Sequence, residues 1–148
     1  VSIQMIRSEG IDLGSSGVAR DFGPGFYTTT SREFAERMGQ MMAARRGGAA
    51  DVAVFRVPNK ELNGLRHHHF PTDNQGWKDM VTYYAGPHRG RIMYPYDMVS
   101  GPIRGSFSKS GVPSLYRSPH NMSQPWPNLY QYSIHTPKAV RLFNQYAR

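Results

Sequence analysis

Two short stretches of this chain hold most of the residues whose types and spacing could do chemistry. Residues 21–31, DFGPGFYTTTS, place two glycines ahead of aromatic residues and a run of hydroxyls. Glycine lets a backbone bend or come close to another group, and hydroxyls can cap a helix or face a ligand. Residues 131–136, QYSIHT, alternate polar and apolar side chains. A strand there would place Gln131, Ser133 and His135 on one polar face, toward solvent or into a cleft.

Histidine is the other candidate for acid–base or metal chemistry, because the chain has six histidines and no cysteine. His120 and His135, with a Lys or Arg to hold phosphate, could be the acid and base of a metal-independent ribonuclease. The triplet 67–69 could bind a metal, but neighbouring residues on a strand point to opposite faces. No Cys or carboxylate pattern completes such a site. We therefore expect an exposed, irregular stretch at 66–70 and no bound metal.

Composition predicts one soluble domain whose second half is basic. A chain of 148 residues fits one domain with a single core. It has no apolar run long enough for a membrane span and no signal-peptide pattern at its start. The net charge is +8, and residues 75–148 hold nine Lys and Arg against two Asp and Glu. This basic half favours an anionic partner, which would be a nucleic acid, an acidic protein or a phosphorylated ligand, and the alternative is a basic surface that serves solubility alone.

The elements that must position these residues follow from periodicity and capping signals. Helices are predicted over 2–9, after Thr30, around 77–84 and from Thr136-Pro137 onward. Strands are predicted at 26–28, 51–57, 96–103 and 130–134. Loops are predicted at 12–21 and 105–128, and the second is long enough to be either functional or mobile. This order of elements predicts an α+β domain.

The helix after Thr30 has the clearest local signals. Thr30 and Glu33 have the spacing of a capping box, and Gly47-Gly48 would end the helix. Its apolar residues recur at helical spacing, which predicts a stripe facing the core. These residues are Phe34, Met38, Met41 and Met42.

Three motifs together resemble the ADP-ribosyltransferase superfamily. Phe22-Gly23-Pro24-Gly25-Phe26-Tyr27, followed by Thr28 and Thr29, is similar to its FGxGxYF element. YDMVSGP at 96–102 and QYSIHTPKA at 131–139 are similar to motifs of ADP-ribosyltransferase-like toxin domains in Rhs and other polymorphic toxins. The three motifs occur in order over most of the chain, so the resemblance is fairly specific.

The resemblance implies a fold and a reaction. The fold would be one α+β domain over 1–148, with a compact split mixed sheet and short helices. The reaction would transfer ADP-ribose from NAD, a co-substrate, without a metal. Tyr27 would stack on the nicotinamide, and Tyr27 and Gln131 would form the catalytic pair. The NAD-binding residues implied are Phe22, Gly23, Gly25, Phe26, Tyr27, Thr28 and Thr29.

The resemblance also implies partners and a setting. The chain would be a delivered toxin domain that acts in the cytoplasm of a target cell. Its acceptor would be a macromolecule, RNA or an acidic or RNA-bound protein, and a cognate immunity protein would block it. Basic and aromatic residues of the second half could dock RNA. These are Arg89, Arg91, Arg104, Lys109, Arg117, Tyr116 and Trp126.

Two departures from the family pattern leave alternatives open. Either the family's first strand, with its His or Arg, precedes residue 1, or the contact with the adenosine ribose of NAD is made differently. The late strand lacks the family's catalytic glutamate, because no acidic residue follows Asp97, and Gln131 stands there instead. An amide can bond a ribose hydroxyl but cannot act as a base, so we expect Gln131 to orient the ribose. The alternatives are a solvent-exposed Gln131, a His-dependent ribonuclease, and a domain of this fold that binds NAD or RNA without catalysis.

Overall fold

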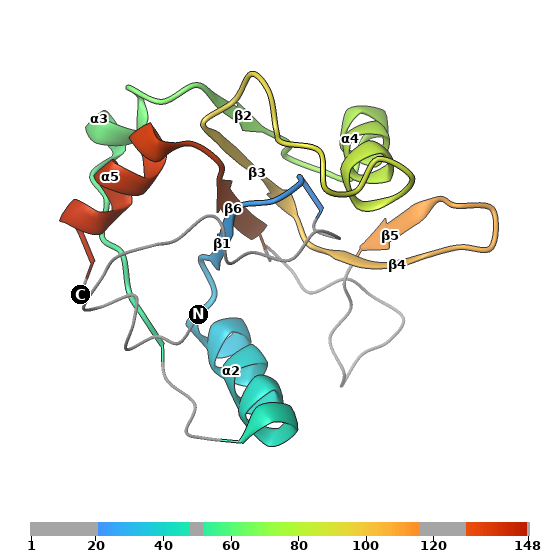
Figure 1. The fold of residues 1–148 in the computed structure, drawn as a ribbon, viewed down its shortest axis with the longest axis horizontal. Coiled ribbons are helices and arrows are strands. Elements are labelled where there is room, and N and C mark those ends of the chain that lie inside the picture. The colour runs from blue at the N-terminus through green and yellow to red at the C-terminus, as the bar shows by residue number, and fades with distance from the viewer. Residues whose placement is uncertain (1–20, 48–51, 116–129, 148) are drawn as a thin grey trace.

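The computed structural model describes residues 21–47, 52–115 and 130–147. They form an α+β fold with a mixed four-stranded sheet, a two-stranded hairpin and short helices (Figure 1). The sheet contains β1 (Phe26–Thr29), β2 (His67–His69), β3 (Met98–Pro102) and β6 (Tyr130–Ile134), in the order β1-β6-β3-β2. Strands β1 and β3 run antiparallel to β6, and β2 runs parallel to β3. Strand β6 therefore lies between β1 and β3 and pairs with both of them.

The remaining elements surround this sheet. The helices are α2 (Arg32–Arg46), α3 (Asn59–Leu62), α4 (Gln75–Ala85) and α5 (Pro137–Gln145). The hairpin consists of β4 (Arg104–Phe107) and β5 (Pro113–Leu115). Figure 1 shows α4 and α5 on opposite sides of the sheet, with the hairpin extending beyond it. The helix predicted over 2–9 lies outside the described residues.

The two faces of the sheet bury separate cores. Helix α5 covers one of them, the α5 face, and α4 covers the other, the α4 face. Strand residues alternate between the faces, so Met98 lies in the first core and its neighbour Val99 in the second. The buried core of the α5 face is Leu65, Met98, Ile134, Ala139 and Phe143. The buried core of the α4 face is Phe22, Phe70, Trp77, Val81, Ala85, Met93 and Val99.

The start of α5 confirms its sequence signal. Thr136 is the N-cap, with Oγ1 accepting from the Ala139 N–H, and Pro137 takes the first turn. The Thr136 hydroxyl also donates to Asp97 at 2.6 Å, and the same carboxylate accepts from the Arg66 N–H at 2.8 Å. Burial alone would raise the pKa of Asp97, but these two bonds and the nearby cations Lys138 and Arg66 hold it below its usual range. Asp97 therefore ties α5 to the start of β2.

The start of α2 differs from the prediction by one residue. The capping hydroxyl is Ser31, whose Oγ accepts from the Phe34 N–H at 3.1 Å, rather than Thr30. The helix ends before Gly47, as predicted, where φ is +79°. Phe34 is buried, while the side chains of the three methionines lie outside the described part.

Three loop and strand predictions were wrong. Residues 52–57 form no named strand, and Phe55 makes one isolated bridge with Ala147. Residues 67–69 are strand β2 rather than an irregular stretch, because pairing with β3 overrides the weak strand preference of polar residues. The first part of 105–128 is the β4–β5 hairpin, while 116–129 lies outside the described residues.

Candidate functional site

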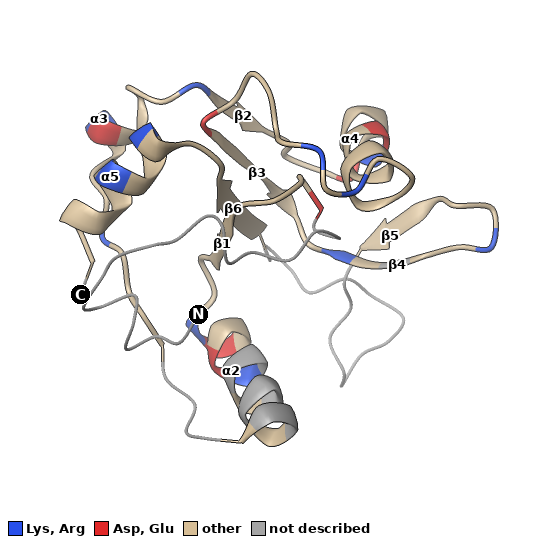
Figure 2. Ribbon diagram, in the orientation of Figure 1, with Lys and Arg blue, Asp and Glu red and all other residues tan. Residues whose placement is uncertain are grey.

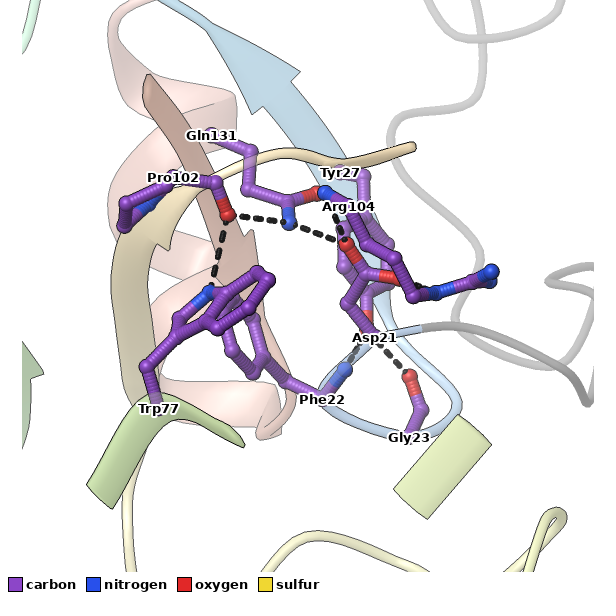
Figure 3. Close-up of polar contacts among 8 residues, drawn as sticks. All are labelled: Asp21, Phe22, Gly23, Tyr27, Trp77, Pro102, Arg104 and Gln131. Atoms are coloured by element: carbon purple, nitrogen blue, oxygen red, sulfur yellow. Dashed lines mark hydrogen bonds and ion pairs between the residues drawn. The ribbon is translucent and has the colours of Figure 1, made fainter. Parts of the chain in front are cut away.

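The side-chain amide of Gln131 joins the late-strand motif to the end of the 96–102 motif and to Asp21, which directly precedes the glycine motif (Figure 3). Gln131 Nε2 donates to Asp21 Oδ2 at 2.6 Å and to the Pro102 carbonyl at 3.2 Å. Asp21 starts the glycine turn, Pro102 ends β3, and Gln131 lies on β6. The Pro102 carbonyl also accepts from Trp77 Nε1 at 3.0 Å. One amide nitrogen thus connects segments that lie far apart in the sequence.

The Asp21 carboxylate is the centre of this network. Its Oδ2 also accepts from the Arg104 backbone N–H at 3.0 Å, and its Oδ1 accepts from Arg104 Nε at 2.8 Å. Asp21 is 7% exposed, and the guanidinium of Arg104 lies over the Phe107 ring, 4.7 Å from its centroid. A buried carboxylate is costly unless it is paired and hydrogen-bonded. Arg104 meets both requirements and fixes the base of the hairpin against the turn.

Gln131 is 7% exposed, so its interpretation as a solvent-exposed strand residue was wrong. Ser133 and His135 are buried with it on the α4 face, so the polar side chains of this segment are enclosed. Both N–H groups of the Gln131 amide are engaged by Asp21 and Pro102. Within the described ranges no donor is recorded on Oε1, so this carbonyl oxygen is the amide atom able to accept from a ligand hydroxyl.

Tyr27 closes the glycine turn. Its hydroxyl accepts from the Phe22 N–H at 2.8 Å and donates to the Gly23 carbonyl at 2.6 Å. The Phe22 ring lies nearly parallel to the Tyr27 ring, with centroids 6.4 Å apart. Gly23 has a φ of +90°, and a Cβ there would lie 2.9 Å from the Arg91 carbonyl oxygen. The turn therefore needs both the tyrosine hydroxyl and this glycine to hold its shape.

The position of His135 leaves no room for a side chain at Gly25. A Cβ at Gly25 would lie 2.6 Å from His135 Nδ1 and 2.6 Å from the Ile134 carbonyl oxygen. His135 Nδ1 donates to the Pro24 carbonyl at 2.8 Å, and Nε2 lies 2.7 Å from Ser133 Oγ. Burial lowers the pKa of His135 to about 4, although the bond to Pro24 acts to raise it. His135 is therefore neutral at pH 7 with its proton on Nδ1, so its Nε2 accepts. The single hydroxyl proton of Ser133 faces both this nitrogen at 2.7 Å and the Val99 carbonyl at 3.2 Å.

The burial of His135 weighs against the ribonuclease alternative. A catalytic acid or base must reach a substrate proton, directly or through one water. His135 is 6% exposed and both of its ring nitrogens contact protein groups. Its partner in that hypothesis, His120, lies outside the described residues. The geometry of His135 is that of a histidine holding the turn to β6.

The other predicted NAD-binding residues are divided between the two faces. Phe26 lies on the α5 face, where its ring meets that of Phe55 edge-on at 5.9 Å. The Thr28 and Thr29 hydroxyls donate to β6 carbonyls, at 3.0 Å to Tyr132 and 2.9 Å to Tyr130. These hydroxyls brace β1 against β6. The structure thus brings together Phe22, Gly23, Tyr27 and Gln131, and sets Phe26 and Thr28 apart from them.

Basic residues are spread over several elements. Figure 2 shows Lys and Arg on α5, on the β4–β5 hairpin and between α4 and β3. Arg89, Arg91 and Lys109 are exposed, whereas Arg104 is paired with Asp21. Arg117, Tyr116 and Trp126 lie outside the described residues. None of the described helices has the length and apolar character needed to cross a membrane.

Sequence reasoning missed four parts of this site. The sequence did not predict that Asp21 and Pro102 bond Gln131, or that Arg104 and Trp77 in turn bond Asp21 and Pro102. The signal available for Asp21 was its position directly before the glycine turn, where an acid can bind backbone N–H groups. Among the residues that the structure describes, no three His, Asp or Glu side chains gather as a metal site.

Comparison with known proteins identifies a family. Residues 2–144 match the model of the DUF3990 family, which is described as a protein of unknown function. The match covers more than half of the chain, so the chain belongs to this family. The comparisons find no similar curated protein and no similar solved structure.

Proposed function

We propose that this member of the DUF3990 family is an NAD-dependent mono-ADP-ribosyltransferase with the split mixed sheet typical of such enzymes. The observation that carries the proposal is the position of the Gln131 amide. Its nitrogen bonds Pro102 and Asp21, the residue directly before the glycine motif, so the amide links the late-strand motif to the end of the 96–102 motif and to the start of the glycine turn. Such convergence is expected of a site assembled around one ligand, because binding residues must be held by their neighbours.

The chemistry assigns a role to each group. Bound NAD would supply a ribose carbon whose bond to nicotinamide breaks while the acceptor bonds to that carbon and loses a proton. Gln131 Oε1 would accept from a ribose hydroxyl and so orient the sugar. The turn at Gly23 would let backbone approach the dinucleotide. Gln131 cannot remove the proton, so the acceptor is itself a good nucleophile or is activated by another group.

The same proposal includes a setting and partners. The domain would be a toxin delivered to the cytoplasm of a target cell, and a cognate immunity protein would block it. The acceptor would be RNA or an acidic or RNA-bound protein, favoured by the net charge of +8. The neutral, enclosed His135 weighs against the ribonuclease alternative.

Transfer of label from NAD tests the proposal. The chain, with its natural preceding sequence, is incubated with labelled NAD and bacterial lysate, and the products are treated with protease or ribonuclease. Label that one treatment releases supports the transferase and identifies the class of acceptor. Absence of both transfer and NAD binding overturns it, and NAD binding without transfer indicates the non-catalytic alternative.

A matched pair of variants tests the role of Gln131. Gln131→Met keeps the side-chain volume and removes the amide, so transfer should fall by about tenfold or more while NAD binding changes less. Trp77→Phe removes a different donor to the same Pro102 carbonyl and should keep transfer. Equal losses of transfer in the two variants would indicate a general effect of the network, and would remove Gln131 from the mechanism.

A further inference from the structure

A second polar cluster lies on the α5 face, beyond the residues that α5 covers. It consists of His67 and His69 on the edge strand β2 and Ser100 on its neighbour β3. His67 Nε2 lies 2.7 Å from Ser100 Oγ, and His69 Nδ1 lies 2.6 Å from the same atom. The register pairs His69 with Ser100, and the alternation of a strand places His67 and His69 on one face. Two imidazole nitrogens therefore converge on one point.

The cluster is open to solvent, although its centre is buried. His67 and His69 are exposed, while Ser100 is 0% exposed. The ring of His67 lies 6.1 Å from that of Tyr132, and the ring of His69 lies 5.7 Å from that of Tyr130. The tyrosines limit the rotation of the two histidines on the β6 side. The two histidines are thus exposed side chains whose facing nitrogens converge on one buried hydroxyl.

Hydrogen-bond accounting shows why the cluster would accept a metal. The Ser100 hydroxyl has one proton, so it can donate to only one of the two nitrogens. The other nitrogen must carry its own proton to bond the same oxygen. If that proton moves to the solvent side of its ring, both facing nitrogens present lone pairs.

We propose that His67 and His69, directed by Ser100, bind one divalent transition-metal ion of the kind that imidazole prefers, Zn²⁺, Cu²⁺ or Ni²⁺. Two imidazole nitrogens on one zinc ion lie at most about 4 Å apart. The present separation is at most the sum of the two distances to Ser100 Oγ, so a shift on the order of 1 Å suffices. Water fills the remaining positions of the ion.

The strand itself provides a matched control. His68 lies between the two ligands in sequence but on the opposite face, where its ring meets Phe70 at 4.4 Å and Tyr96 at 5.0 Å. A variant of His68 therefore removes one histidine from the same triplet without touching the proposed site. Mg²⁺ is the second control, because it prefers oxygen ligands.

Calorimetric titration with Zn²⁺ at neutral pH tests the proposal, with the thermal midpoint of each variant measured with and without the ion. We expect the full chain to bind Zn²⁺ and to gain thermal stability. H67Q and H69Q, singly and together, should keep their metal-free midpoints and lower the affinity by about tenfold or more. H68Q should bind Zn²⁺ with unchanged affinity. The full chain should show no binding of Mg²⁺. Zn²⁺ binding equally weakened in H68Q and H69Q, or absent from the full chain, overturns the proposal.

Discussion

Single residues explain why the glycine motif and the late-strand motif occur together in this chain. Gly25 has no side chain, and His135 fills the space where one would stand. Asp21 likewise supplies the carboxylate that Gln131 Nε2 requires in its buried position. Buried polar groups must find partners, so each residue constrains the identity of the other. The two motifs therefore pack as one unit, and a ligand site formed by their residues would be rigid.

Gly25→Ala tests this contact directly. The added methyl would lie 2.6 Å from both His135 Nδ1 and the Ile134 carbonyl oxygen, so backbone must move. We expect the free energy of unfolding to fall by about 2–3 kcal/mol, measured by urea denaturation. Gly64→Ala is the control, because a Cβ there would first meet an atom at 3.4 Å, an ordinary contact. Similar losses in both variants would contradict the role given to His135.

His135 also predicts a dependence of stability on pH. Its pKa is about 4 in the folded chain, against 6.5 for an ordinary histidine. Above pH 6.5 both states are neutral and the stability is fully present. As the pH falls from 6.5 toward 4, the unfolded chain gains a proton that the folded chain excludes. The free energy of unfolding should therefore drop by about 3 kcal/mol over this range.

Urea denaturation between pH 7 and pH 4.5 measures most of this drop, with His135→Gln as the variant that cannot titrate. The variant should show a distinctly shallower dependence on pH. His67, whose pKa is also lowered, contributes in the same direction to both proteins. Asp97 titrates below its usual range, and so outside this window. Identical pH profiles for the two proteins would show that His135 is not the group responsible.

At the scale of elements, local signals decided what the sequence could predict. Helix α5 follows from Thr136 and Pro137, and α4 from the apolar spacing of Trp77 and Val81. These signals lie within one segment. Strand β2 has three histidines and exists because β3 pairs with it, which no local pattern records. The β4–β5 hairpin depends in the same way on Arg104 reaching Asp21, 83 residues away.

The same distinction between local signals and long-range contacts applies to the candidate site. The glycine turn and Gln131 were identified because residue types and motif order are visible in the sequence. Their connection through Asp21 and Pro102 was not visible, because it is made by long-range contacts. The burial of Gln131 was missed for the same reason. Strand alternation gives the face of a side chain, but not what covers that face.

Asp21→Asn tests the link between the turn and the hairpin. The amide can still accept from Arg104, but it loses the charge and presents an N–H group where oxygen now accepts. We expect a loss of about 2–3 kcal/mol in the free energy of unfolding. Glu36→Gln is the control, since its ion pair with Arg32 on α2 is largely exposed and should matter by less than about 0.5 kcal/mol. Equal effects would contradict the structural role of Asp21.

At the scale of the whole molecule, one sheet separates two cores and also couples them. Met98 and Ile134 pack under α5, while Val99 packs under α4. Strand β3 therefore contributes to both cores through alternate residues, and β6 contributes Ile134 to one core and the buried polar residues Gln131 and Ser133 to the opposite face. If one core is lost, these strands lose half of their packing. The described part of the chain should therefore unfold as one cooperative unit.

Phe143→Ala tests this coupling from the α5 side. Removing the buried ring should lower the free energy of unfolding by about 3–5 kcal/mol. Trp77 lies on the α4 side and is fully buried, so its fluorescence reports the other core. In a Trp126→Phe background, Trp77 becomes the single tryptophan of the chain. The midpoint of its fluorescence transition in urea should fall together with that of the circular dichroism signal. A fluorescence midpoint that stays at the parent value would mean that the two cores unfold independently.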